Sequence, residues 1–111
     1  MTAKEEAHQN RLDRLPMAQA VVAHVYGIGL DELLAPCRHR PRAAHARQVA
    51  MYLAHTVLHL NLAEIARAFG RDRNAARHAC RRVEAQRENR DVDRTLAWLE
   101  TLVRAAAGAA A

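Results

Sequence analysis

The sequence predicts an all-α protein, a compact bundle of five to six helices that contains a helix-turn-helix. Among the 111 residues are only four glycines and three prolines, and half of the residues are hydrophobic when alanine is counted. No run of strand length alternates apolar with polar residues, whereas apolar residues recur at helical spacing between stop signals. This length suits one modest core, so we expect a single ordered domain over residues 16–104.

The elements in the first half of the chain follow from apolar spacing and from helix stop signals. Residues 1–15 are polar and are predicted to be a flexible segment. A helix is expected over 16–26, where a proline suits the first turn and a glycine follows the end. A short helix is expected over 30–34, and the basic stretch 36–41 should be extended because prolines border it. A long helix then runs over 43–59.

Two short helices separated by a tight turn are predicted over residues 62–84. Apolar residues at i, i+3, i+4 and i+7 form one stripe up to Phe69, and Gly70 ends that helix. Asp72 or Asn74 can cap the next helix, because a short polar side chain accepts the free N–H groups of its first turn. The second helix has an apolar stripe made of Ala76, Ala79, Cys80 and Val83. Its other faces carry arginines, and a helix presented in this way fits the major groove of DNA.

A last helix is predicted over residues 92–103. It is expected to pack Leu96, Trp98, Leu99 and Leu102. Tyr52 and Trp98 are interpreted as core residues, although the last helix could also supply a homodimer surface. The alanine-rich tail 105–111 is predicted to be flexible.

The positive charge of the chain is concentrated in two segments. Residues 38–47 carry four arginines and no acid, and residues 71–90 carry seven arginines against three acids. A GC-rich genome accounts for part of the arginine content, but a merely basic surface would spread its charge more evenly. The concentration therefore indicates a polyanionic partner.

Several functional classes are disfavoured. The charged N-terminus and the lack of any run of about 18 apolar residues argue against a signal peptide, a membrane span and a membrane partner, so we expect a cytoplasmic, nucleoid-associated protein.

With only Cys37 and Cys80, a buried thiol at Cys80 is favoured over a disulfide. His55 and His59 share a helix face without a third ligand, so no metal site is expected. No carboxylate pair, cysteine–histidine constellation or cofactor loop occurs, so we expect neither an enzyme nor a cofactor.

Four segments of the chain carry a resemblance to a known family. They are Ala46–Ala54, Leu62–Ile65, Ala68–Asp72 and His78–Glu84. These segments resemble the C-terminal DNA-binding domain of the bacterial replication initiator DnaA, which has RQ-x-AMYLA, a L-x-EI-x-x-x-F segment and a GGRDHTTV-x-HA signature. The resemblance covers residues 16–103 and implies a Trp repressor-like helix-turn-helix that binds double-stranded DNA.

The resemblance, together with the arginines expected on the polar faces of the second helix, gives candidate DNA contacts. The residues expected to read bases are Asp72, Arg73, Asn74 and Arg77. The residues expected to contact the DNA backbone are Arg47, Gln48, Arg71, His78, Arg81 and Arg82. An arginine of the basic loop, Arg38 or Arg40, is expected to enter the minor groove, where narrow grooves attract arginine.

The chain departs from the family pattern where bases are read. Residues 73–76 are Arg-Asn-Ala-Ala in place of HTTV, and a single glycine, Gly70, stands where the family has two. Because the threonine methyl groups are lost and new bidentate side chains appear, we expect a DNA site different from the initiator's own box.

Three functions are compatible with these features. The leading interpretation is a sequence-specific transcriptional regulator, with RNA polymerase or another regulator as a possible partner. The alternatives are a regulator of replication initiation that binds at or near the origin, and a protein-interaction module whose DNA face has decayed. The 111 residues leave no room for an ATPase domain and contain no G-x-x-x-x-G-K-[ST] loop, so we expect a stand-alone DNA reader.

Overall fold

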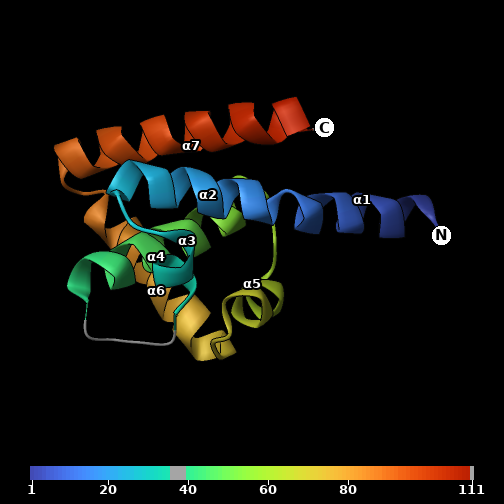
Figure 1. Ribbon diagram of the computed structural model, residues 1–111, viewed down its shortest axis with the longest axis horizontal. Coiled ribbons are helices and arrows are strands. Elements are labelled where there is room, and N and C mark those ends of the chain that lie inside the picture. The colour runs from blue at the N-terminus through green and yellow to red at the C-terminus, as the bar shows by residue number, and fades with distance from the viewer. Residues whose placement is uncertain (36–39, 111) are drawn as a thin grey trace.

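The computed structural model describes residues 1–35 and 40–110, which form seven α-helices and no strand (Figure 1). The helices are α1 (Ala3–Asp13), α2 (Leu15–Tyr26), α3 (Leu30–Leu34), α4 (Pro41–Thr56), α5 (Leu62–Phe69), α6 (Arg73–Gln86) and α7 (Arg90–Ala110). The all-α prediction is confirmed, and the six expected helices correspond to α2–α7. Part of the stretch expected to be extended, 36–39, lies outside the described residues, as does Cys37. None of the described helices is long and apolar enough to cross a membrane.

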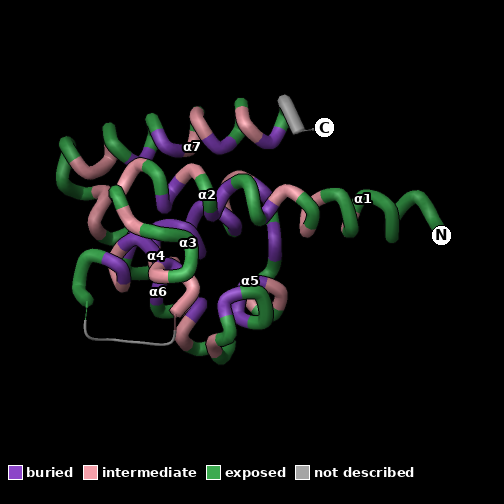
Figure 2. The backbone as a smooth tube through the Cα atoms, in the orientation of Figure 1, coloured by how far each residue is buried: buried purple, intermediate pink, exposed green. Residues whose placement is uncertain are grey.

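Both ends of the chain are helical where the sequence predicted flexible segments. Thr2 starts α1 with a capping box, in which its hydroxyl accepts from the Glu5 amide at 3.1 Å and the Glu5 carboxylate accepts from the Thr2 amide. At the other end α7 continues into the alanine-rich tail as far as Ala110, because alanine is the best helix former and Ala107 is buried against the core. The helix α1 extends beyond the body of the protein and buries none of its residues (Figure 2).

The core is built around α4, which is buried on nearly every side. All residues from 49 to 54 are buried, as expected for a helix that is surrounded by other helices. The helices α2 and α7 lie side by side on one side of it, and α5 and α6 lie on the other (Figure 1). This arrangement leaves the outer face of α6 uncovered by any other described helix.

The turn between α5 and α6 has the features that the sequence predicted. Gly70 has a φ of 63°, the left-handed conformation that ends a helix, and the Arg71 amide donates to the Ala66 carbonyl at 2.8 Å. Asp72 caps α6 by accepting from the Ala75 amide at 2.7 Å. Of the two caps that were considered, the structure therefore uses Asp72. The thiol of Cys80 on the inner side of α6 is free and half-buried.

The prediction that Trp98 lies in the core is wrong. Its surface is 52% exposed, whereas Tyr52 is buried as expected. The buried stripe of α7 consists of Leu96, Leu99, Val103 and Ala107. Because successive helical residues are rotated by about 100°, the side chain next to Leu99 points away from this stripe. Because Leu96 and Leu99 face the core, Trp98 lies on a different side of the same helix and faces outward.

A polar cluster joins α6 to α4 and α7. The Arg87 guanidinium donates to the Asp93 carboxylate at 2.5 Å, to the Glu100 carboxylate at 2.9 Å and to the Tyr52 hydroxyl at 3.0 Å. The Tyr52 hydroxyl donates in turn to Glu84. Burial opposes the charge on Arg87, but the hydrogen bonds to Asp93, Tyr52 and Glu100 outweigh it and raise the pKa of the guanidinium. The cluster therefore holds the end of α6 with a permanently charged group.

Replacing Arg87 by methionine is expected to lower the free energy of unfolding by about 1 to 3 kcal/mol, because it leaves three polar side chains without their donor. The measurement is urea denaturation followed by circular dichroism. The matched control is Arg94→Met on the exposed side of α7, which should change stability by less than about 0.5 kcal/mol. Equal effects of the two substitutions would show that the cluster does not stabilise the fold.

Candidate nucleic-acid interface

The candidate interface is the outer face of α6, which is separated from an apolar inner face. Ala76, Ala79 and Val83 are buried against the core. Exposed on the outer side are Arg73, Asn74, His78, Arg81 and Arg82, and Arg77 is half-exposed. Most of the predicted contacts on α6 are therefore accessible to a partner.

The predicted base-reading residues gather at the first two turns of α6. Arg73 and Asn74 are its first two residues, and the Arg77 guanidinium donates to the Asn74 side-chain oxygen at 3.0 Å. Asp72 precedes them and already uses one carboxylate oxygen for the helix cap. The structure thus assigns Asp72 a structural role that the resemblance did not indicate.

Only part of the altered segment 73–76 faces outward. Arg73 and Asn74 are exposed, Ala75 is half-buried, and Ala76 is fully buried in the core. The change at Ala76 therefore alters the packing of α6 and not the surface that could contact bases. The apolar spacing in the sequence also predicts Ala76 on the inner face of this helix, unlike Arg73 and Asn74.

Four of the predicted backbone contacts line one hollow between α4 and α6. They are Arg47, Gln48, Arg71 and His78. Residues more than 20 positions apart in the sequence are brought together here because α4 and α6 pack side by side. Arg81 and Arg82 lie further along α6 and do not line this hollow.

Two of these arginines also hold the end of α3 in place. Arg47 is buried, and its guanidinium donates to the Leu33 carbonyl at 2.7 Å and to the Glu32 carbonyl at 3.3 Å. Arg71 donates to the Ala35 carbonyl at 3.0 Å. The last carbonyls of a helix have no partner within the helix, so these arginines satisfy them. Sequence reasoning missed this role because the partner atoms belong to the backbone of a distant segment.

The two candidates for the minor groove have different outcomes. Arg38 lies outside the described residues. Arg40 is the N-cap residue of α4, is exposed, and forms an ion pair with Glu32 at 3.1 Å. Exposed ion pairs of this kind contribute about 0 to 1 kcal/mol, so Arg40 can exchange this partner for another anion at little cost.

Known proteins share this fold and its helix-turn-helix. The family model "Bacterial dnaA protein helix-turn-helix" matches residues 17–83, from α2 to the last turns of α6. The crystal structure of a DNA replication initiation factor superposes with a TM-score of 0.81 and 31% sequence identity, over 90% of this chain and 31% of that one. A structure of the replication initiator DnaA bound to AMPPCP and single-stranded DNA gives a TM-score of 0.75 and 33% identity, over 90% of this chain and 30% of that one.

This chain therefore spans about a third of the length of the initiators that it matches. The match includes the helices α4, α5 and α6, which carry most of the candidate contacts. Because the family model covers more than half of the chain and the fold agrees, the protein belongs to the bacterial DnaA helix-turn-helix family.

Proposed function

We propose that the protein binds double-stranded DNA at specific sequences through α6 and that this binding serves the control of replication initiation. The different character of the two faces of α6 supports this function most directly. Its alanine-rich inner face packs against the core, and its outer face presents arginines and an asparagine to a partner. A helix of this kind in a helix-turn-helix enters the major groove with its N-terminal residues at the base edges.

The first turns of α6 are suited to base recognition. Arginine forms two hydrogen bonds with guanine, and asparagine does the same with adenine. Because Arg73 and Asn74 are exposed at the N-terminal end of the helix, they are the residues best placed for such contacts. The positive end of the helix dipole also attracts nearby phosphates.

The hollow between α4 and α6 is suited to the DNA backbone. Arg47 and Arg71 are fixed by hydrogen bonds to α3, so their charges are held in position before DNA binds. Gln48 and His78 add polar groups to the same hollow. In this proposal Arg81 and Arg82 contact phosphates further along α6, and Arg40 leaves Glu32 to enter the minor groove.

Replication control is favoured over transcriptional regulation by two structural relatives described above, a DNA replication initiation factor and the replication initiator DnaA. Transcriptional regulation remains the second candidate because Arg73 and Asn74 replace the family's histidine and threonine. Different base-contacting residues indicate a different DNA target sequence, and copies of that sequence need not lie at an origin. Any protein partner, such as RNA polymerase, belongs to this second candidate.

Binding to duplex DNA is expected to weaken steeply with salt. We assume that about five cationic side chains contact DNA phosphates and displace counterions. A plot of the logarithm of the affinity against the logarithm of the salt concentration should then have a slope of roughly −4 to −5. Binding-site selection from a random duplex pool supplies the probe, and fluorescence anisotropy measures the slope. Failure to retain any duplex at low salt would contradict DNA binding and support a protein-interaction role. The single strand of the selected sequence should bind more weakly than the duplex.

Replacing Arg73 or Asn74 by alanine should relax the base preference by about 1 to 3 kcal/mol at one position of the site. The control is Arg81→Ala, which should weaken all duplexes alike because it removes a phosphate contact. All three side chains are exposed, so circular dichroism should show an unchanged fold. Arg47 is unsuited to this comparison, because its loss would also free carbonyls of α3. Identical behaviour of all three variants would refute the division into base and backbone contacts.

Chromatin immunoprecipitation separates the two candidate roles. If the protein controls replication initiation, bound sites should concentrate at the origin, and the motif under the peaks should match the one selected in vitro. Sites scattered over promoters without enrichment at the origin would favour transcriptional regulation instead. Loss of the peaks in the Arg73→Ala strain is the control for binding through α6.

A further inference from the structure

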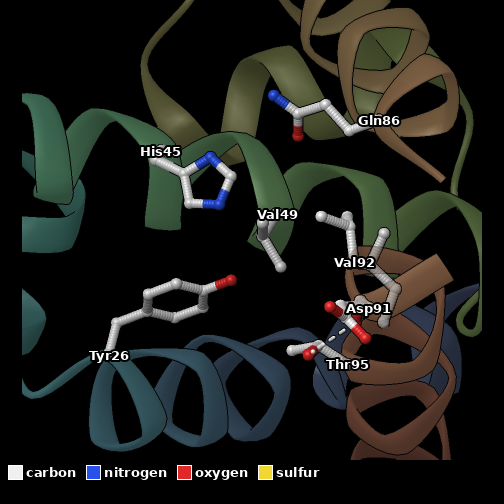
Figure 3. Close-up of a pocket in the computed structure, with 8 residues that line it drawn as sticks. Tyr26, His45, Val49, Gln86, Asp91, Val92 and Thr95 are labelled. Atoms are coloured by element: carbon white, nitrogen blue, oxygen red, sulfur yellow. Dashed lines mark hydrogen bonds between the residues drawn. The ribbon is translucent and has the colours of Figure 1, made fainter. Parts of the chain in front are cut away.

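A pocket of about 230 Å³ lies where α2, α4, α6 and α7 meet, and none of the proposed DNA contacts is among the described residues that line it (Figure 3). Apolar side chains from α4 and α7, namely Val49, Val92 and Leu96, form much of its wall. The Tyr26 ring from α2 and the imidazole of His45 from α4 close another side, with their centroids 5.6 Å apart in an edge-on arrangement. The walls therefore favour a flat, largely apolar occupant.

One buried side-chain oxygen among the described residues that line this pocket has no hydrogen-bond partner. The side-chain oxygen of Gln86, the last residue of α6, is buried and accepts no hydrogen bond. Figure 3 shows this oxygen directed toward the pocket. Buried acceptors are nearly always satisfied in folded proteins. An occupant that donates an N–H group to this atom would supply the missing bond.

The other polar groups of the pocket do not favour an anion. Burial and, next, the charge of Arg82 lower the pKa of His45, so its ring is neutral at neutral pH. Burial raises the pKa of Tyr26, which keeps its proton. Asp91 adds a carboxylate, and the Thr95 hydroxyl already donates to the Asp91 carbonyl at 3.0 Å. No arginine or lysine is among the described residues that line the pocket.

We propose that this pocket binds a small molecule with a single aromatic ring and an N–H donor, of the aryl amine class. The N–H group donates to the Gln86 side-chain oxygen, and the ring packs between Tyr26 and Val92. The size is adequate, because apolar cavities of roughly 150 Å³ already hold a benzene ring. Such a ligand contacts the two helices that carry the DNA contacts, α4 and α6, together with α2 and α7.

The test compares two probes that differ in one group, aniline and toluene, in which an amino group replaces a methyl group. Aniline should produce saturable shifts of backbone amides around the pocket in a two-dimensional NMR titration of the full chain. Toluene should bind about three- to tenfold more weakly, because it cannot donate to Gln86. Equal affinities, shifts that do not saturate or shifts centred outside the pocket would overturn the proposal.

A substitution adds a second, independent readout. Gln86→Leu should reduce the affinity for aniline to that for toluene and leave the affinity for toluene unchanged or higher. The matched control is Gln9→Leu on α1, which makes the same chemical change at an exposed position outside the pocket. An unchanged affinity for aniline in folded Gln86→Leu would refute the proposed hydrogen bond. If that variant does not fold, the comparison of aniline with toluene on the unmodified protein tests the proposed hydrogen bond by itself.

Discussion

The close packing of α6 against α4 determines which face of α6 is open to a partner. Both Ala76 and Ala79 are buried at this contact, and small side chains let two helix axes approach closely. The exposed arginines lie on the other sides of the same helix, so burial of the alanine face directs them toward solvent. The hollow that gathers the candidate backbone contacts is a consequence of the same packing.

The arginines of the protein divide into two groups by their surroundings. Arg47, Arg71 and Arg87 donate hydrogen bonds to carbonyls or carboxylates and join distant segments. Arg73, Arg81 and Arg82 are exposed on α6. The first group joins segments of the fold, and two of its members, Arg47 and Arg71, also line the hollow proposed for the DNA backbone. The second group is exposed to a partner without such a structural role. A charge count along the sequence cannot separate these groups, because both occur in the same basic segments.

Much of the fold could be predicted because it depends on local patterns. Helical spacing identified α2 to α7, Gly70 identified the end of α5, and Asp72 was one of the two expected caps. The ends of the chain were predicted less well. A polar segment such as α1 can still form a helix when a capping box starts it, and periodicity in apolar residues does not detect that.

Local sequence patterns account for the helical class, the helix-turn-helix and the residue types on α6, since these depend on neighbours within a few positions. The packing of the helices determines which side chains are buried, exposed or hydrogen-bonded. It buried Ala76 and exposed Trp98, and it engaged Arg47 with carbonyls 14 and 15 positions away. It also left the Gln86 oxygen without a donor in a pocket shared by four helices. The physical reason is that burial and hydrogen-bond partnership depend on segments far apart in the chain, which meet only in the folded state.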